Sequence, residues 1–190
     1  MIPRGLPRPI GEQDLAMAIA AAVEPVRCWL TLAAYQGLRA GELAWLDRAD
    51  VLDRVREPAL RVRGKGGGTE RLLPLGRTGL AALRAYGLPR SGPVFRDPAG
   101  RSFSPRQVSQ RCNRHLHAVG VQETLHQCRH RFAIEALAAV GTGNVRVVQE
   151  LLGHASPATT AIYTWVAPVR AVEAVTALDQ LGQPTLRLVD

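Results

Sequence analysis

The sequence almost lacks lysine: of its 24 basic residues, only Lys65 is a lysine, and all the others are arginine. An arginine stays charged at any working pH, whereas a lysine can release its proton when its surroundings lower its pKa. A lysine retained in so arginine-rich a chain is therefore a candidate proton donor. On composition alone, chance remains the simpler explanation.

Other shortages exclude whole classes of protein. Aromatic residues make up only 5% of the chain, which argues against base stacking on single-stranded nucleic acid as the main binding mode. No apolar run approaches the roughly 20 residues that span a bilayer, and the first ten residues lack the apolar stretch of a signal peptide. The three cysteines, Cys28, Cys112 and Cys128, form no C-x-x-C pair. Their odd number favours a reducing cytoplasm, and no zinc site is expected.

What the chain does contain suits one folded domain. It has 190 residues, of which 46% are hydrophobic and 21% charged. The net charge of +8 is unevenly distributed: residues 96–131 hold seven basic and two acidic residues, whereas residues 132–190 have a net charge of −2. We therefore expect a polyanionic partner to contact the middle of the chain.

Apolar spacing and capping residues predict a mainly helical protein. The expected helices cover residues 12–23, 25–36, 77–86, 104–119, 125–140 and 144–152, with a short helix in 41–46, another beginning at Ser156 and a last one over 169–178. Two short apolar segments flank GKGGGTE at residues 64–70 and predict a β-hairpin. The expected fold class is therefore α+β, mainly helical, with a small antiparallel hairpin or sheet.

Four segments stand out from this background. They are GLRAGEL (37–43), RGKGGGTERLLPL (63–75), LHQCRHRFA (125–133) and LLGHASPATTAIYTW (151–165). Together they resemble the catalytic-domain motifs of the tyrosine recombinases, the phage-integrase family, in the family's order and approximate spacing. The resemblance extends from about Pro9 to Pro168. Its most specific element is the last segment, in which His154 stands nine positions before Tyr163.

The resemblance implies a DNA-cleaving and rejoining enzyme that needs no metal, ATP or other small-molecule cofactor. It places six residues at the family's active-site positions: Arg39, Lys65, His126, Arg129, His154 and Tyr163. The chemistry suits these residue types, because phosphodiester cleavage requires a nucleophile, charge stabilisation on the phosphoryl oxygens and a proton for the leaving oxygen. In the family the tyrosine is the nucleophile, the arginines bind the phosphate and the lysine is the general acid.

Two further residues are expected to support this site. Glu42 lies three positions after Arg39 and is placed to orient its guanidinium. His126 and His130 share one helical face with Arg129, and His130 is expected to be structural.

The helix predicted from Ser104 is the candidate DNA-contacting element beyond the active site. One face would carry polar side chains that suit phosphates and base edges: Arg106, Gln110, Asn113, Arg114 and His117. The opposite face would carry Val108, Cys112, Leu116 and Val119. An ordinary solvated face explains the polar spacing equally well.

The expected organisation follows from the resemblance. Residues 1–10 would be a linker remnant, 11–180 the catalytic domain and 181–190 a tail, and the family's N-terminal core-binding domain would be absent. The expected partner is double-stranded DNA, bound by a homo-tetramer that is monomeric when free. We expect no membrane contact and a cytoplasmic location, with nucleoid association on DNA.

Three alternatives stay open or are set aside at this stage. A non-catalytic DNA-binding regulator could retain the same fold, and a type IB topoisomerase would use similar chemistry to relax DNA. A nucleotide-binding loop is set aside, because the glycines around Lys65 lack the P-loop spacing and no Ser or Thr follows the lysine.

Overall fold

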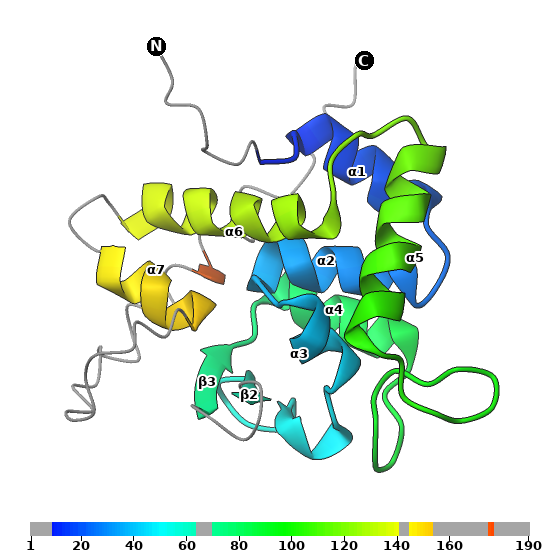
Figure 1. The fold of residues 1–190 in the computed structure, drawn as a ribbon. Coiled ribbons are helices and arrows are strands. Elements are labelled where there is room, and N and C mark those ends of the chain that lie inside the picture. The colour runs from blue at the N-terminus through cyan, green and yellow to red at the C-terminus, as the bar shows by residue number, and fades with distance from the viewer. Residues whose placement is uncertain (1–8, 64–69, 141–144, 154–174, 177–190) are drawn as a thin grey trace, which may run out of the picture.

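Helix α2 (Val26–Gln36) lies at the centre of the molecule, in a computed structural model that describes residues 9–63, 70–140, 145–153 and 175–176. Around it pack α1 (Glu12–Ala21), α4 (Arg77–Tyr86), α5 (Pro105–Ala118) and α6 (Leu125–Val140) (Figure 1). The short α3 (Ala40–Ala44) packs on α5, and α7 (Val145–Leu152) packs on α6. Eight of the eleven residues of α2 are buried, as expected of a mostly apolar helix that other helices surround.

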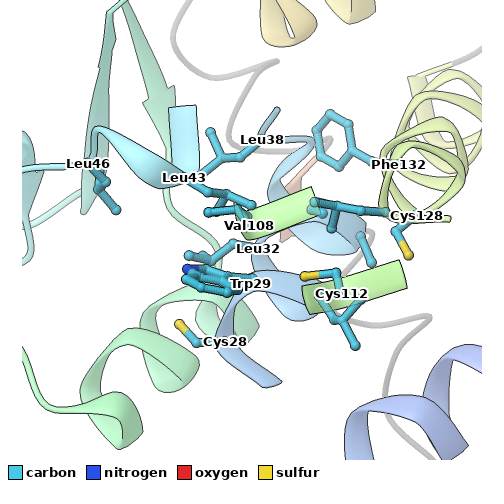
Figure 2. Close-up of a cluster of buried hydrophobic side chains, with 14 of the residues drawn as sticks. Cys28, Trp29, Leu32, Leu38, Leu43, Leu46, Val108, Cys112, Cys128 and Phe132 are labelled. Atoms are coloured by element: carbon cyan, nitrogen blue, oxygen red, sulfur yellow. The ribbon is translucent and has the colours of Figure 1, made fainter. Parts of the chain in front are cut away.

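The core around α2 is built mainly from leucines, with aromatic rings and small side chains packed among them (Figure 2). The Trp29 ring makes edge contacts with Phe103, at 5.0 Å between centroids, and with Phe95, at 5.6 Å. These contacts fasten the long connection between α4 and α5 to the core. The three cysteines are free thiols in the same core, where burial raises the pKa of each.

A small antiparallel sheet lies beside this helical core, with strand order β1-β2-β3. The strands are β1 (Val51–Leu52), β2 (Ala59–Arg63) and β3 (Glu70–Pro74), and the 3₁₀ helix η1 (Arg48–Asp50) leads into the first of them. Leu60 pairs with Leu73, and both side chains are fully buried. The predicted hairpin is therefore confirmed, whereas β1 and η1 were not predicted. The hairpin's turn, residues 64–69, lies outside the described residues.

The other elements largely follow the sequence prediction. Helix α4 has the predicted bounds. Helix α5 begins with the predicted serine cap: Ser104 Oγ accepts from Gln107 N at 3.2 Å, and Gln107 Oε1 accepts from Ser104 N at 2.8 Å. Helix α1 ends two residues earlier than predicted, because the backbone is already extended at Ala22.

Two predicted C-terminal helices fall mostly outside the described residues. The helix beginning at Ser156, with Tyr163, lies wholly outside them. Of the predicted helix 169–178 only Val175 and Thr176 are described; both are helical, and Val175 is buried. Within the described ranges, no helix is long and apolar enough to cross a membrane.

Candidate active site

The site begins where α2 ends. Gly37 adopts a left-handed conformation (φ 66°), and a Cβ there would lie 2.5 Å from the Phe132 ring, so both the turn and the close packing require glycine. The chain then restarts as α3, with Arg39 at the N-cap position. Glu42 folds back over this helix start: its Oε2 accepts from Arg39 N at 2.8 Å, and its Oε1 accepts from Arg39 Nη1 at 3.2 Å. The structure thus has the predicted contact between Glu42 and Arg39.

Two further guanidinium groups approach the same carboxylate. Arg71, on β3, donates from Nη1 to Glu42 Oε1 at 2.9 Å. Arg129, on α6, places Nη1 3.7 Å from Glu42 Oε2. We call Arg39, Arg71 and Arg129 the arginine cluster. Among the described residues one carboxylate faces three guanidinium groups, so this part of the site has an excess of positive charge and is suited to an anion.

The Glu42 carboxyl group is buried, and burial alone would raise its pKa. The hydrogen bond and charge of Arg71, the Arg39 backbone N–H and the charge of Arg129 outweigh this effect and lower the pKa below its ordinary value. Glu42 is therefore ionised at neutral pH and holds the arginine cluster together.

The arginine cluster also binds the carboxyl end of α7, one carbonyl to each guanidinium. Arg71 Nε donates to Leu151 O at 3.0 Å, Arg129 Nη2 to Leu152 O at 2.6 Å, and Arg39 Nη2 to Gly153 O at 3.2 Å. The last carbonyls of a helix lack intrahelical partners and carry the negative end of its dipole, so cations stabilise them. The described parts of the four sequence segments thus meet at one place.

The members of the cluster differ in burial. Arg129 is only 3% exposed and also donates from Nη1 to Gly37 O. Burial, followed by the charge of Arg39, lowers the pKa of Arg129, although a guanidinium remains charged at neutral pH. The Arg39 side chain, in contrast, is 41% exposed. An anion arriving from solvent would therefore meet Arg39 before Arg129.

The two histidines of α6 lie together, as predicted. The rings of His126 and His130 are in edge contact, with centroids 4.3 Å apart. His126 is exposed, yet partial desolvation, followed by the charges of Arg129 and Arg39, lowers the pKa of its imidazole. His126 is therefore neutral at neutral pH and able to accept a proton or donate a hydrogen bond.

The remaining predicted active-site residues, Lys65, His154 and Tyr163, lie outside the described residues. The structure adds one residue that the sequence did not single out, Arg71. A weak signal for it exists: on β3 it shares a face with the buried Leu73, and an arginine on the inner face of a strand needs a partner.

The polar face of α5 is largely free for contact. Arg106, Gln110, Arg114 and His117 are exposed, while the opposite face buries Val108, Cys112 and Leu116 as predicted. Asn113 is half-buried, and its Oδ1 accepts from Leu125 N at 2.9 Å. Its carbonyl oxygen thus holds the first residue of α6, a structural role that the helical spacing alone did not indicate.

Comparison with known proteins shows which family the chain is related to. The model of the phage integrase family matches residues 12–170. The chain belongs to this family. Tyrosine recombinase XerC of Pseudomonas aeruginosa (strain LESB58) is 37% identical to this integrase-family chain over 179 residues, covering 85% of this chain and 56% of that protein. XerC of Rhizobium meliloti (strain 1021) is 34% identical over 191 residues, covering 90% and 58% respectively.

Solved structures confirm the fold. The integrase from mycobacterium phage Brujita is 31% identical, with a TM-score of 0.77, over 98% of this chain and 63% of that one. XerA recombinase shares the fold at 23% identity, with a TM-score of 0.67, over 95% of this chain and 64% of that one. This integrase-family chain thus spans a little over half the length of the curated relatives it matches.

Proposed function

We propose that this chain is the catalytic part of a site-specific DNA recombinase, which cleaves and rejoins duplex DNA through a 3′-phosphotyrosyl intermediate. The observation that carries the proposal is the arginine cluster around Glu42, where the described parts of the family motifs converge. A cluster with more positive than negative charge, open to solvent at Arg39, suits a phosphodiester group. The XerC relatives support the same conclusion.

In the proposed reaction Arg39 and Arg129 of the arginine cluster bind the scissile phosphate. The Tyr163 oxygen attacks phosphorus and forms a new P–O bond while the bond to the 5′ oxygen breaks. Lys65 gives its proton to that oxygen, which leaves as a hydroxyl group, and a neutral imidazole such as His126 accepts the proton that the Tyr163 phenol loses. The broken DNA ester bond is replaced by a phosphotyrosyl ester, so the bond energy is retained. The reverse reaction can therefore rejoin the strand without ATP or metal.

The roles of the six active-site residues, and of His130 as support, belong to this proposal. So do the domain boundaries and a homo-tetramer on double-stranded DNA. A non-catalytic DNA-binding regulator is the second candidate. The six occupied active-site positions disfavour it, and the Leu-Leu-Gly-His segment suits a recombinase better than a type IB topoisomerase.

Covalent capture tests the proposal directly. The chain is incubated with a pool of nicked duplexes whose central positions are randomised, and protein-linked DNA is recovered under denaturing conditions and sequenced. A nick lets the cleaved end diffuse away, so the covalent product accumulates. We expect a covalent product from the wild-type chain and none from Tyr163→Phe. If both proteins bind the pool equally and neither forms a covalent product, the regulator is the better description. Plasmid relaxation without site preference would instead favour a topoisomerase.

A further inference from the structure

Arg71 connects the sheet to the arginine cluster. Its side chain is only 15% exposed and makes two long-range contacts, from Nη1 to Glu42 Oε1 at 2.9 Å and from Nε to Leu151 O at 3.0 Å. A single planar guanidinium thus bonds to both α3 and α7 from its place on β3. Its Nη2 is also buried and has no hydrogen-bond partner among the described residues.

The packing around Arg71 is close. A Cβ at position 153 would lie 2.4 Å from Arg71 Nη1 and 2.8 Å from its Cζ, so the guanidinium rests against the bare backbone of Gly153. Gly153 in turn presents the carbonyl that accepts from Arg39. The position of Arg71 therefore influences where the carboxyl end of α7 meets Arg39.

Arg71 also competes with Arg39 for the same carboxylate oxygen. Glu42 Oε1 is 2.9 Å from Arg71 Nη1 and 3.2 Å from Arg39 Nη1. Without Arg71, two of the described guanidinium groups, those of Arg39 and Arg129, would share the negative charge of Glu42. The cluster would also lose one of its three positive charges. Arg39 would then be more strongly paired and less available to an anion from solvent.

We propose that Arg71 is a positioning residue of the recombinase site: by holding Glu42 and the carboxyl end of α7, it keeps the charge of Arg39 available to the scissile phosphate. The inference rests on the proposed function, because the phosphate is the group that Arg39 would bind. Arg71 acts through Glu42, Arg39 and α7, not by touching the reacting atoms.

The test compares a charged with a neutral phosphate. The probe is a nicked duplex whose cleavage position has been mapped by covalent capture, made with either the natural phosphate or a methylphosphonate there. Arg71→Met removes the charge and both hydrogen bonds but retains an apolar stem. Arg61→Met is the matched control, since Arg61 lies on the neighbouring strand and pairs at 2.9 Å with an exposed glutamate, Glu70. Binding is measured in the Tyr163→Phe background and single-turnover cleavage with Tyr163 present.

We expect Arg71→Met to slow cleavage of the natural phosphate on the order of ten- to a hundredfold at saturating DNA, because a displaced phosphate-binding group lowers the rate of the chemical step. Cleavage of the neutral methylphosphonate should change much less, and the binding preference for the charged phosphate should fall. Arg61→Met should leave both the relative cleavage rates and the relative binding of the two DNAs unchanged. Arg71→Lys should restore part of the cleavage rate on the natural phosphate.

Equal slowing on both DNAs would show that Arg71 only stabilises the fold, and a wild-type rate for Arg71→Met would also overturn the inference. If Arg71→Met does not fold, Arg71→Lys is used instead, because it retains the charge but cannot make both contacts. The inference is then contradicted if Arg71→Lys has the same ratio of cleavage rates on the natural phosphate and the methylphosphonate as the wild type. Failure of the proposed function looks different, because the wild-type chain itself then gives no covalent product.

Discussion

A single buried carboxylate, Glu42, organises the charges of this site. Its basic partners lower the pKa of its carboxyl group below the ordinary value, although burial alone would raise it. A group with a lowered folded-state pKa contributes stability above its unfolded pKa, about 4.3 for glutamate, and that contribution is lost as the pH falls through the folded-state value. The cluster should therefore be strongest at neutral pH and weaken only in acid.

Replacing Glu42 by Gln tests this argument. Removing one partner from a buried ion pair leaves the others uncompensated, so we expect Glu42→Gln to lower the free energy of unfolding by about 3 kcal/mol at pH 7. The difference from wild type should stay constant down to about pH 5 and shrink below about pH 4.3, where the Glu42 carboxyl group of the unfolded chain takes up a proton while that of the folded protein is still ionised. Urea unfolding at a series of pH values measures it.

The control for Glu42→Gln is Glu70→Gln. The Glu70 side chain is 55% exposed and pairs only with the half-exposed Arg61 among the described contacts. Exposed pairs contribute at most about 1 kcal/mol, so its replacement should have little effect at any of these pH values. An equal loss in both variants would contradict a special role for Glu42.

At the scale of elements, the end of α7 depends on one glycine. Gly153 has φ 60°, and an added Cβ would meet the Arg71 guanidinium. Gly120, after α5, also has a positive φ (86°), but nothing lies within 4 Å of an added Cβ there. Both Gly→Ala replacements incur the cost of a left-handed alanine, about 1 kcal/mol. Gly153→Ala should lower the free energy of unfolding by at least about twice that amount, because Arg71 must also give up hydrogen bonds.

Urea unfolding of the two alanine variants measures this difference. If Gly153→Ala and Gly120→Ala lose the same stability, the guanidinium does not constrain the helix end. A second readout is the covalent-capture rate, which should fall only for Gly153→Ala, since only that glycine presents a carbonyl to Arg39.

The elements differ in how far the sequence could predict them. Helix α4 and the Ser104 cap of α5 follow from local spacing and side-chain chemistry, which the sequence displays directly. The two-residue strand β1 is too short for any periodicity to show. The sequence gives only a weak signal for Arg71, because its partner Leu151 lies 80 residues further along the chain. Asn113 was predicted on the polar face of α5, but it is half-buried, and a tertiary contact in which its Oδ1 accepts from Leu125 N gives its oxygen a structural role.

For the whole molecule, the distribution of charge relates α5 to the site. The most basic part of the chain, residues 96–131, contains all of α5, and α5 packs against α3, the helix that Arg39 begins. Pro105, in the first turn of α5, comes within 3.8 Å of where a Cβ on Gly41 of α3 would lie. The exposed arginines of α5 thus lie on a helix that packs against the helix that Arg39 begins.

This arrangement predicts how DNA affinity depends on salt. Each phosphate contact that is lost reduces the slope of log K against log salt by about 0.9 for duplex DNA. The double replacement of Arg106 and Arg114 by Gln should therefore make the slope shallower by about 2, measured on the captured duplex in the Tyr163→Phe background. Replacing the exposed Arg84 and Arg90 by Gln removes the same charge from outside α5 and should leave the slope nearly unchanged. An equal change in both double variants would mean that only net charge matters and that the polar face of α5 is an ordinary solvated surface.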